Sequence, residues 1–382
     1  MRVLYVAPRY HTNQTLVMKG WLEHGHQVRF LSQFAGTSED YTVLQPVILG
    51  YSGLFEGVMR IYRFFFCRKE KSATREFDLR IKIGFPPIGR AKKQLQEFQP
   101  DLVIVRERSV YNIPFARICK KKRIPCVLYN QSPLWDKPDR DKGWKKKFLL
   151  ALSPKIRMTP VMGTTGNGNV KTSNSYFVPF VTEPHCSPEE KLHFQNEKIQ
   201  LLCVGRYEER KNLFLLLNAV KELIGKYKLH LTIIGEAIDQ NQMEYYEKLK
   251  KQILAYHLEQ QVTLLQNFNM EQMYEEYRKA DLFVLPSTRE RASIAQLEAM
   301  SCSLPVICSD TNGSACYVEE GVNGWLFADN KESDLREKIE KSVCDRSRLL
   351  RMGQESYRIV QEKYCFINYY KEIMKCKEGC TL

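Results

Sequence analysis

The chain has 382 residues, of which 43% are hydrophobic and 27% charged, and this composition excludes an intrinsically disordered protein. A chain of this length exceeds the size at which a single core stops growing, so we expect two domains. The net charge of +14 is concentrated in one half: residues 1–200 contain 33 Lys and Arg against 17 Asp and Glu, whereas residues 201–382 contain 25 against 27. The basic half indicates an anionic partner, for which an anionic membrane and nucleic acid are the candidates.

The N-terminal half alternates short apolar strands with helical patterns. Strands are predicted at Arg2–Ala7, Gln27–Ser32, Asp101–Arg106 and Pro125–Tyr129. The spacing between the first two predicts a helix that ends at Gly25. This alternation predicts a parallel sheet covered by helices.

Two polar residues follow strands of this half. His11 comes after the first strand and Gln131 after the fourth, so both are candidates for an acceptor-side or cleft role. A lone histidine is more often structural, and that alternative stays open for both residues.

We expect neither a secretion signal nor a membrane-spanning segment. The first residues, MRVLYVAPRYHTN, are typical of a strand and a polar loop. The run Ile61–Cys67 is much shorter than the roughly 18 apolar residues that a membrane span requires. The expected location is cytoplasmic, extending to a peripheral position at the inner face of the cell membrane.

Residues 54–65 have an amphipathic pattern. Apolar residues spaced by four, three and four positions form one stripe: Leu54, Val58, Ile61 and Phe65. Basic residues lie nearby: Arg60, Arg63, Arg68 and Lys69, with further clusters at 120–123 and 145–147. A helix of this kind suits the interface of an anionic membrane. The same stripe also fits a helix that packs on its own domain, so both alternatives stay open.

The C-terminal half repeats the alternation more clearly. Strands are predicted at Ile199–Gly205, His230–Gly235, Gln261–Gln266, Leu282–Pro286 and Pro305–Ser309. The connection between the halves is placed at about residues 180–198, within a segment rich in Gly, Asn, Thr, Ser and Pro.

The predicted fold class is α/β, with two facing Rossmann-like doubly wound parallel-sheet domains. The domains are expected at residues 1–190 and 191–360, and a helix within 361–382 is expected to cross back to the N-terminal domain. In open sheets of this type ligands bind at the carboxyl ends of the strands, so the ligand cleft is expected between the two domains.

The segment LPSTRERASIAQLEAMSCSLPVICSD, residues 285–310, has the pattern of a strand end, a polar loop, a helix and a second strand. The helix is expected to begin near Ser293. Free backbone amides of Ala292, Ser293 and Ile294 at its N-terminus would favour an anion such as a diphosphate.

Two pairs of charged residues accompany this loop. Glu290 precedes the helix and Glu298 lies within it, with seven residues between them. Carboxylates accept paired hydrogen bonds from vicinal hydroxyls, so one glutamate fits a sugar and the other a ribose. Arg206 and Lys211 follow a buried strand, where they could neutralise a leaving diphosphate without a metal ion. For each pair the alternative is an ordinary solvated charge.

Together these segments resemble the retaining glycosyltransferases of family 4, which have the GT-B fold. The shared elements are the G-R-x4-K turn, K-A-D-L-F-V-L-P-S at 279–287, the E-x7-E spacing, L-E-A-M followed by L-P-V-I, and E-G-V-N-G-W-L-F at 320–327. They cover the C-terminal half closely and the N-terminal half only in outline. The resemblance implies transfer of a sugar from a nucleotide-diphospho-sugar to an acceptor hydroxyl, with retention at the anomeric carbon. It implies no essential divalent metal and no other cofactor, and it places the activity in cell-surface polysaccharide or glycolipid synthesis.

The resemblance also implies residue roles. Arg206 and Lys211 would bind the diphosphate and Glu290 the donor-sugar hydroxyls, so these three form the catalytic set. Glu298 would bind the ribose, and Phe268 lies in the loop that contacts the base. Directly after Glu290 the usual Gly or Pro, Phe, Gly is replaced by Arg291, Ala292 and Ser293, so the donor sugar and base are not assigned.

The expected partners are a nucleotide-sugar donor, a glycan or lipid-linked acceptor and an anionic membrane surface. A nucleotide-sugar epimerase with GT-B-like sheets is the alternative enzyme, and the E-x7-E spacing argues against it. A basic nucleic-acid-binding protein is the second alternative, but no RRM, KH, zinc-finger or basic-zipper signature is present, so no nucleic acid is expected.

No metal site is expected. Asp139-Arg140-Asp141 is formally a D-x-D motif, but no apolar strand precedes it. Cys376 and Cys380 have no matching pair at zinc spacing. The twelve cysteines are expected to be buried free thiols, because several lie within apolar strands.

Overall fold

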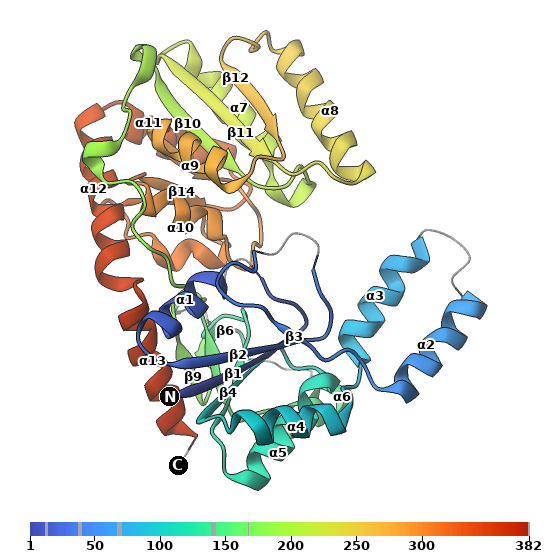
Figure 1. Cartoon of the computed structure of the whole chain (residues 1–382). Helices are drawn as coiled ribbons and strands as arrows, with labels where there is room; N and C mark the ends of the chain where they lie inside the picture. The colour runs from blue at the N-terminus through green and yellow to red at the C-terminus, as the bar shows by residue number, and fades with distance from the viewer. Residues whose placement is uncertain (12–13, 37–39, 67–70, 139–142, 167, 381–382) are drawn as a thin grey trace. The chain divides into compact units, whose positions relative to one another are not determined.

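The computed structural model describes residues 1–11, 14–36, 40–66, 71–138, 143–166 and 168–380. The chain divides into two compact units. The N-terminal unit consists of Met1–Val181 and Phe366–Leu382, and the C-terminal unit is Thr182–Cys365. In each unit the strands form a layer covered by helices (Figure 1).

The N-terminal unit contains a seven-stranded sheet in the order β3-β2-β1-β4-β5-β7-β9, with every neighbouring pair parallel. Its strands are β1 (Arg2–Ala7), β2 (Gln27–Ser32), β3 (Val47–Ile48), β4 (Leu102–Arg106), β5 (Cys126–Tyr129), β7 (Ile156–Thr159) and β9 (Ser175–Phe177). A separate antiparallel pair is formed by β6 (Trp135–Asp136) and β8 (Val170–Lys171). In β1, Val3 and Tyr5 enter one core, whereas Leu4 and Val6 enter the other. A central parallel strand is buried on both faces, which explains its continuous apolar sequence.

Helices cover both faces of this sheet. On the Tyr5 side lie α1 (Thr15–Glu23) and α13 (Phe366–Gly379). On the Leu4 side lie α4 (Ile88–Phe98) and α5 (Ile113–Lys122), with α6 (Trp144–Leu152) beside α5.

The last helix of the chain, α13, is part of the N-terminal core. The rings of Trp21 and Phe366 meet edge to face with their centroids 5.2 Å apart. A Cβ atom at Gly20 would lie 2.2 Å from a carbon of the Phe366 ring, so only glycine permits this contact. Residues at opposite ends of the sequence therefore share one hydrophobic core.

Two helices follow β3 at the edge of the sheet: α2 (Gly53–Phe66) and α3 (Lys71–Ile83), drawn in light blue in Figure 1. The helix predicted over residues 54–65 is confirmed. Its apolar stripe is exposed, so the alternative that the stripe packs on its own domain is wrong for Leu54, Val58, Ile61 and Phe65. Arg68 and Lys69 lie outside the described residues, as do the side chains of Lys145 and Lys146.

The C-terminal unit contains a six-stranded parallel sheet in the order β12-β11-β10-β13-β14-β15. Its strands are β10 (Ile199–Val204), β11 (Leu229–Gly235), β12 (Val262–Gln266), β13 (Leu282–Leu285), β14 (Val306–Ser309) and β15 (Gly324–Phe327). Its helices are α7 (Leu213–Ile224), α8 (Gln240–Ala255), α9 (Met270–Lys279), α10 (Ile294–Ser301), α11 (Glu332–Val343) and α12 (Arg346–Lys363). The apolar residues of β10, β11 and β13 form one core with α7, α8 and α11.

Among the described residues, no helix is both long enough and apolar enough to cross a membrane. The eleven described cysteines are free thiols. Cys203 and Cys308 are buried as predicted, whereas Cys126 is half-buried and Cys344 is exposed, so the expected burial is wrong for these two.

Candidate active site

The first part of the site lies at the carboxyl end of β10 in the C-terminal unit. The strand ends at Val204, directly before Gly205, and a short helical turn at Glu209–Lys211 returns the Lys211 side chain across this end. A Cβ atom at Gly205 would lie 2.9 Å from Cε of Lys211, so the missing side chain leaves room for the lysine. Lys211 is thereby buried with its ammonium group held near the strand end.

Lys211 Nζ lies 2.6 Å from Oε2 of Glu290, which comes from the loop between β13 and α10. Arg210 Nη1 lies 2.6 Å from the same oxygen. Burial raises the pKa of Glu290, but the Lys211 charge and the hydrogen bonds from Arg210 and Lys211 outweigh it, so the pKa is lowered from its ordinary value. Glu290 is therefore a carboxylate at neutral pH.

Backbone contacts fix the loop that carries Glu290. The Gly313 N–H donates to the Glu290 carbonyl at 2.8 Å, and the Thr288 N–H donates to the Arg210 carbonyl at 2.9 Å. Arg289 has a φ of +48° and donates its N–H to Thr311 Oγ1 at 3.1 Å. These bonds connect the loop to segments on both sides of it, so the Glu290 carboxylate is preorganised.

At the start of α10, one of the three predicted free amides is occupied. The Ser293 N–H donates to Ser314 Oγ at 2.5 Å, so the prediction of a free Ser293 amide is wrong in this structure. The cause is the turn at Gly313–Tyr317, which places the Ser314 hydroxyl against both the N–H and the carbonyl of Ser293. Among the described residues, the amides of Ala292 and Ile294 have no hydrogen-bond partner.

Glu298 lies inside α10, and its carboxylate is not freely solvated. The Tyr277 hydroxyl donates to its Oε2 at 2.9 Å. Burial raises the pKa of Glu298, and the Tyr277 hydrogen bond opposes that shift. A half-buried carboxylate with one side-chain donor among the described residues retains acceptor capacity for further hydroxyl groups.

The side chains of Arg206 and Lys211 have different partners in this structure. Arg206 Nε lies 3.1 Å from Oε2 of Glu236, and both side chains are more than half exposed. No hydrogen bond or ion pair among the described residues joins Arg206 to Lys211 or Glu290. Arg206, Lys211 and the Ser293 amide thus have three separate partners in this structure.

The predicted base-contacting loop follows β12. Asn267 has a φ of +57°, and its N–H donates to the Gly235 carbonyl at 3.0 Å. Its side-chain oxygen accepts from the Ala237 N–H at 3.2 Å. These contacts hold half-buried Phe268 next to the carboxyl end of β11.

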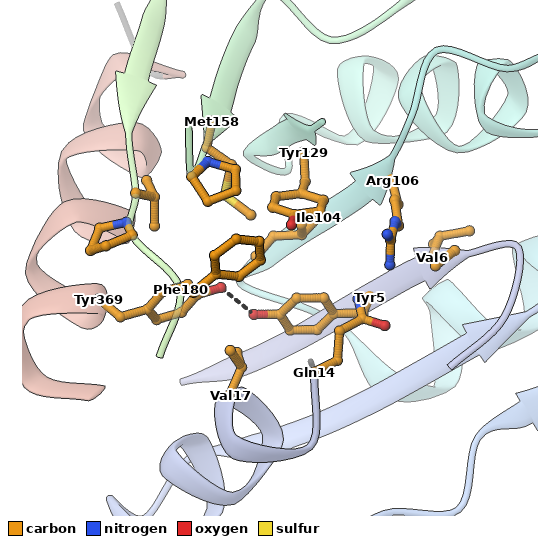
Figure 2. A pocket seen from close by; sticks show the side chains of 14 residues that line it. Tyr5, Val6, Gln14, Val17, Ile104, Arg106, Tyr129, Met158, Phe180 and Tyr369 are labelled. Atoms are coloured by element: carbon orange, nitrogen blue, oxygen red, sulfur yellow. Dashed lines mark hydrogen bonds between the residues drawn. The ribbon is translucent and has the colours of Figure 1, made fainter. Parts of the chain in front are cut away.

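The N-terminal unit contains a cavity of about 30 Å³ at the carboxyl ends of β1, β4 and β5. Figure 2 shows the hydroxyls of Tyr5 and Tyr369 meeting on one side of it, 3.0 Å apart, while Arg106 and Tyr129 line it from β4 and β5. Arg106 Nη1 is buried and has no hydrogen-bond partner among the described residues. The cavity therefore combines aromatic walls with one unsatisfied cationic donor.

Both acceptor-side candidates lie close to this cavity. Burial and the charges of Arg106 and Arg9 lower the pKa of His11 to about 3, so His11 is neutral at pH 7. Arg9 Nε lies 3.3 Å from its Nε2 atom, which therefore accepts a hydrogen bond. Gln131 follows Tyr129, a residue of the cavity wall, by two positions.

The D-x-D motif at Asp139–Asp141 lies outside the described residues. Within the described part of the chain, no group of three or more His, Cys, Asp or Glu side chains is arranged to hold a metal ion.

Sequence reasoning missed several residues of the site. Arg210, Glu236, Tyr277 and Ser314 each contact a predicted residue. Only Arg210 had a signal in the sequence, because it is a second cation directly before Lys211.

The sequence pattern of the family described as "Glycosyl transferases group 1" matches residues 188–359. This range contains the strand end with Arg206 and Lys211 and the loop with Glu290. The match covers less than half of the 382 residues, and within it the segment that carries Arg206, Lys211 and Glu290 is similar to the glycosyl transferases group 1 family.

Two relatives illustrate the similarity to this family. The human α-1,3/1,6-mannosyltransferase ALG2 is 30% identical over 179 residues, which are 44% of this chain and 42% of that protein. The lipopolysaccharide 1,6-galactosyltransferase of Escherichia coli K12 is 26% identical over 287 residues, 69% of this chain and 75% of that protein. For most of the curated relatives it matches, the chain spans about half of their length or less.

Solved glycosyltransferases share the whole fold. HepE of Anabaena in complex with UDP has a TM-score of 0.69 at 14% identity, covering 99% of this chain and 100% of that one. A glycosyltransferase of Rickettsia africae ESF-5 has a TM-score of 0.70 at 12% identity, covering 99% and 98%. The predicted GT-B fold class, with two Rossmann-like parallel-sheet domains, is confirmed.

Proposed function

We propose that this chain is a group 1 retaining glycosyltransferase that moves a sugar from a nucleotide-diphospho-sugar to an acceptor hydroxyl. The observation that carries the proposal is the contact between Lys211 and Glu290 at 2.6 Å, formed by two segments of the family-matched region. It joins a buried cation and a fixed carboxylate at the carboxyl edge of a parallel sheet, where ligands bind in open α/β folds.

In the proposed reaction, Lys211 stabilises the negative charge that develops on the leaving diphosphate. An ammonium group has three N–H donors, and the bond to Glu290 uses one of them, so two can reach phosphate oxygens. Ile294 is the first residue of α10 and Ala292 lies just before its N-cap, so their amides come four and two residues after Glu290, and a helix N-terminus favours an anion. This arrangement supplies leaving-group stabilisation from the chain itself, so the proposed reaction has no essential divalent metal.

Arg206 is proposed as the second diphosphate ligand. Its partner, Glu236, is an exposed residue, and exposed ion pairs contribute only about 0–1 kcal/mol. A diphosphate carries more negative charge than one carboxylate, so Arg206 can exchange Glu236 for the substrate at little cost.

The two glutamates are proposed to orient the sugar and the ribose. Glu290, held as a carboxylate by Lys211 and Arg210, accepts hydrogen bonds from donor-sugar hydroxyls. Glu298, fixed by Tyr277, accepts hydrogen bonds from the ribose, and the backbone beside Phe268 contacts the base. Binding of this kind accelerates the reaction where the contacts strengthen in the transition state.

The cavity of the N-terminal unit is proposed to hold part of the acceptor. Neutral His11 and Gln131 supply polar groups near its wall, and Arg106 supplies an unsatisfied donor. At about 30 Å³ the cavity has room for a small group only, so the proposed contact is with one polar or anionic group of the acceptor, to which Arg106 would donate. Acceptors in cell-surface polysaccharide or glycolipid synthesis fit this description, and the relatives include a lipopolysaccharide galactosyltransferase.

The test is incubation of the protein with UDP-, GDP- and ADP-sugars, with release of nucleotide diphosphate as the measurement. We expect transfer or slow donor hydrolysis with one of them, unchanged by EDTA, and loss of release in Lys211→Met. NMR of the product is expected to show the anomeric configuration of the donor. Interconversion of the sugar nucleotide without release would instead support an epimerase, and inversion in the product would remove the retaining assignment.

A further inference from the structure

One face of α2 is apolar and exposed to solvent. Its side chains are exposed by 85% at Leu54, 55% at Val58, 61% at Ile61, 71% at Phe64 and 67% at Phe65. We call these five residues the α2 stripe. Soluble proteins rarely leave a contiguous group of large apolar side chains in water, so the α2 stripe indicates an interaction surface.

The opposite side of the helix is already used for packing. Met59 is 2% exposed, whereas its neighbours Val58 and Arg60 point outward. The helix therefore has a buried face of its own, and the exposed stripe is a second apolar face. Only one of these two faces packs on the chain.

Ion pairs between α2 and α3 fix this orientation. Arg80 on α3 contacts Glu56 through Nη1 at 2.7 Å and Glu76 through Nε at 2.9 Å. Arg63 on α2 reaches the same Glu76 with two hydrogen bonds, at 2.9 and 2.7 Å. Bidentate arginine–carboxylate pairs add geometric specificity, so they hold α2 against α3 with the stripe outward.

Charge decides which partner suits the stripe. Residues 53–83 contain eight Lys or Arg against four Asp or Glu, within the half of the sequence that carries the positive excess. The three described arginine–glutamate ion pairs in this hairpin involve Arg63 or Arg80, and Lys82 lies 4.0 Å from Asp78. Outward-facing Arg60 therefore adds positive charge beside the stripe. An apolar stripe bordered by basic side chains is complementary to an anionic lipid surface, where the helix lies in the plane of the headgroups.

We propose that the α2 stripe inserts into the interface of an anionic bilayer and docks the N-terminal unit on the membrane. The arginine and lysine side chains contact lipid phosphates, and the apolar side chains enter the boundary between headgroups and acyl chains. This inference does not depend on the proposed glycosyl transfer, because it concerns a surface and not the chemistry.

The experiment is flotation of the purified full chain with vesicles of phosphatidylcholine alone or of phosphatidylcholine with phosphatidylglycerol. Flotation with the anionic vesicles only is expected, and it should weaken as salt is raised. The double variant Ile61→Ser with Phe65→Ser should lower anionic-vesicle binding at least about tenfold, since it removes two apolar contacts. Arg60→Gln should lower it about fivefold, the effect of roughly 1 kcal/mol per basic residue at the surface.

Leu254→Ser is the matched control, because Leu254 is an apolar residue 49% exposed on α8 of the C-terminal unit. It should bind vesicles as the unsubstituted chain does. Circular dichroism and melting temperature identify any variant that fails to fold, and such a variant is replaced by Leu54→Ser, whose side chain is 85% exposed.

Three outcomes would overturn the proposal. Equal flotation with both vesicle types would exclude charge-driven docking. Loss of binding in Phe148→Ser, with Ile61→Ser/Phe65→Ser unaffected, would move the contact to α6, where Phe148 is 57% exposed. A dimer in light scattering that the stripe variant converts to a monomer, without vesicle binding, would assign the stripe to a second copy of this chain.

Discussion

Lys211 Nζ and Glu290 Oε2 lie 2.6 Å apart although 79 residues separate them in the sequence. Each side chain is only 11% exposed, so both charges are largely removed from water. A buried ion pair of this kind is weak evidence for stability, because desolvation offsets much of the attraction. The position of this ion pair at the carboxyl edge of a parallel sheet is better explained by a role in binding or catalysis.

Lys211→Met is expected to lower kcat/KM about 100-fold or more, by analogy with the loss of a single preorganised donor to a developing anion. Glu290→Gln should cause a loss of similar size. The double variant should lose less than the product of the two effects, since residues that act as a unit are not additive. The measurement is the initial rate of transfer or donor hydrolysis.

Lys228→Met is the control for the general effect of replacing a lysine by methionine. Lys228 pairs with Glu197 at 2.9 Å, with side chains 72% and 78% exposed, so its removal should leave both rate and stability nearly unchanged. A Lys211→Met protein with the rate of the Lys228→Met protein would exclude Lys211 from the site.

The pairing of Arg206 with Glu236 leads to a second prediction. If Arg206 must leave Glu236 to bind the donor, Glu236→Gln should tighten binding of the nucleoside diphosphate by up to about fivefold, the worth of an exposed ion pair. Arg206→Gln should weaken the same binding. Isothermal titration with the nucleoside diphosphate that supports activity is the measurement, and equal affinity in all three proteins would remove Arg206 from the diphosphate site.

Most of the sheet core was predictable because parallel strands have a strong local signal. The strands at Arg2–Ala7 and Gln27–Ser32 are confirmed at both ends, and β10 and β14 differ from their predictions by one residue at one end. β15 was missed because its sequence, GWLF, is only four residues long and follows a glycine-containing turn. β7 and β9 lie in the polar segment before the predicted connection at residues 180–198, where no strand was predicted.

The site was predictable only where the chemistry is local in sequence. The pairing of Lys211 with Glu290 depends on β10 and β13 being neighbours in the sheet, and the strand order was not predicted from the sequence. Ser314 could not be foreseen as the partner of the Ser293 amide, because the turn that carries it has no distinctive pattern. Contacts between segments far apart in sequence arise from tertiary packing, which single-sequence patterns do not encode.

Gly205, directly after β10, and Gly235, the last residue of β11, should respond differently to substitution by alanine. A Cβ atom at Gly235 would lie 2.3 Å from the Gly205 carbonyl oxygen, and backbone cannot move aside cheaply. Gly235→Ala should therefore destabilise the protein by roughly 1–3 kcal/mol, as overpacking does. At Gly205 the nearest atom is Cε of Lys211, 2.9 Å away on a flexible side chain.

Gly205→Ala should consequently keep most of the stability and lose activity, because Lys211 is displaced from Glu290. Urea unfolding and the initial rate, measured on both variants, distinguish the two effects. A Gly205→Ala protein with full activity would show that the position of Lys211 is not critical.

His11 gives a prediction for the pH dependence of stability. Its pKa is lowered to about 3 in the folded protein, by burial and by the charges of Arg106 and Arg9, from an ordinary value of 6.5. Between these two pH values the unfolded chain binds more protons at this residue than the folded chain. The contribution of His11 to the free energy of unfolding therefore falls as the pH is lowered from 6.5 towards 3, by up to about 1.4 kcal/mol per pH unit.

His11→Gln removes this proton uptake, so the stability of the variant relative to the unsubstituted protein should rise as the pH is lowered from 7 to 5. Urea unfolding at several pH values measures the difference, and it also cancels the titration of all groups common to both proteins. The ring protons of His11 in NMR spectra should not titrate in the same range. A midpoint near 6.5 for those protons would mean that neither burial nor the Arg106 charge acts on His11 in solution, and the neutral imidazole near the cavity would have to be abandoned.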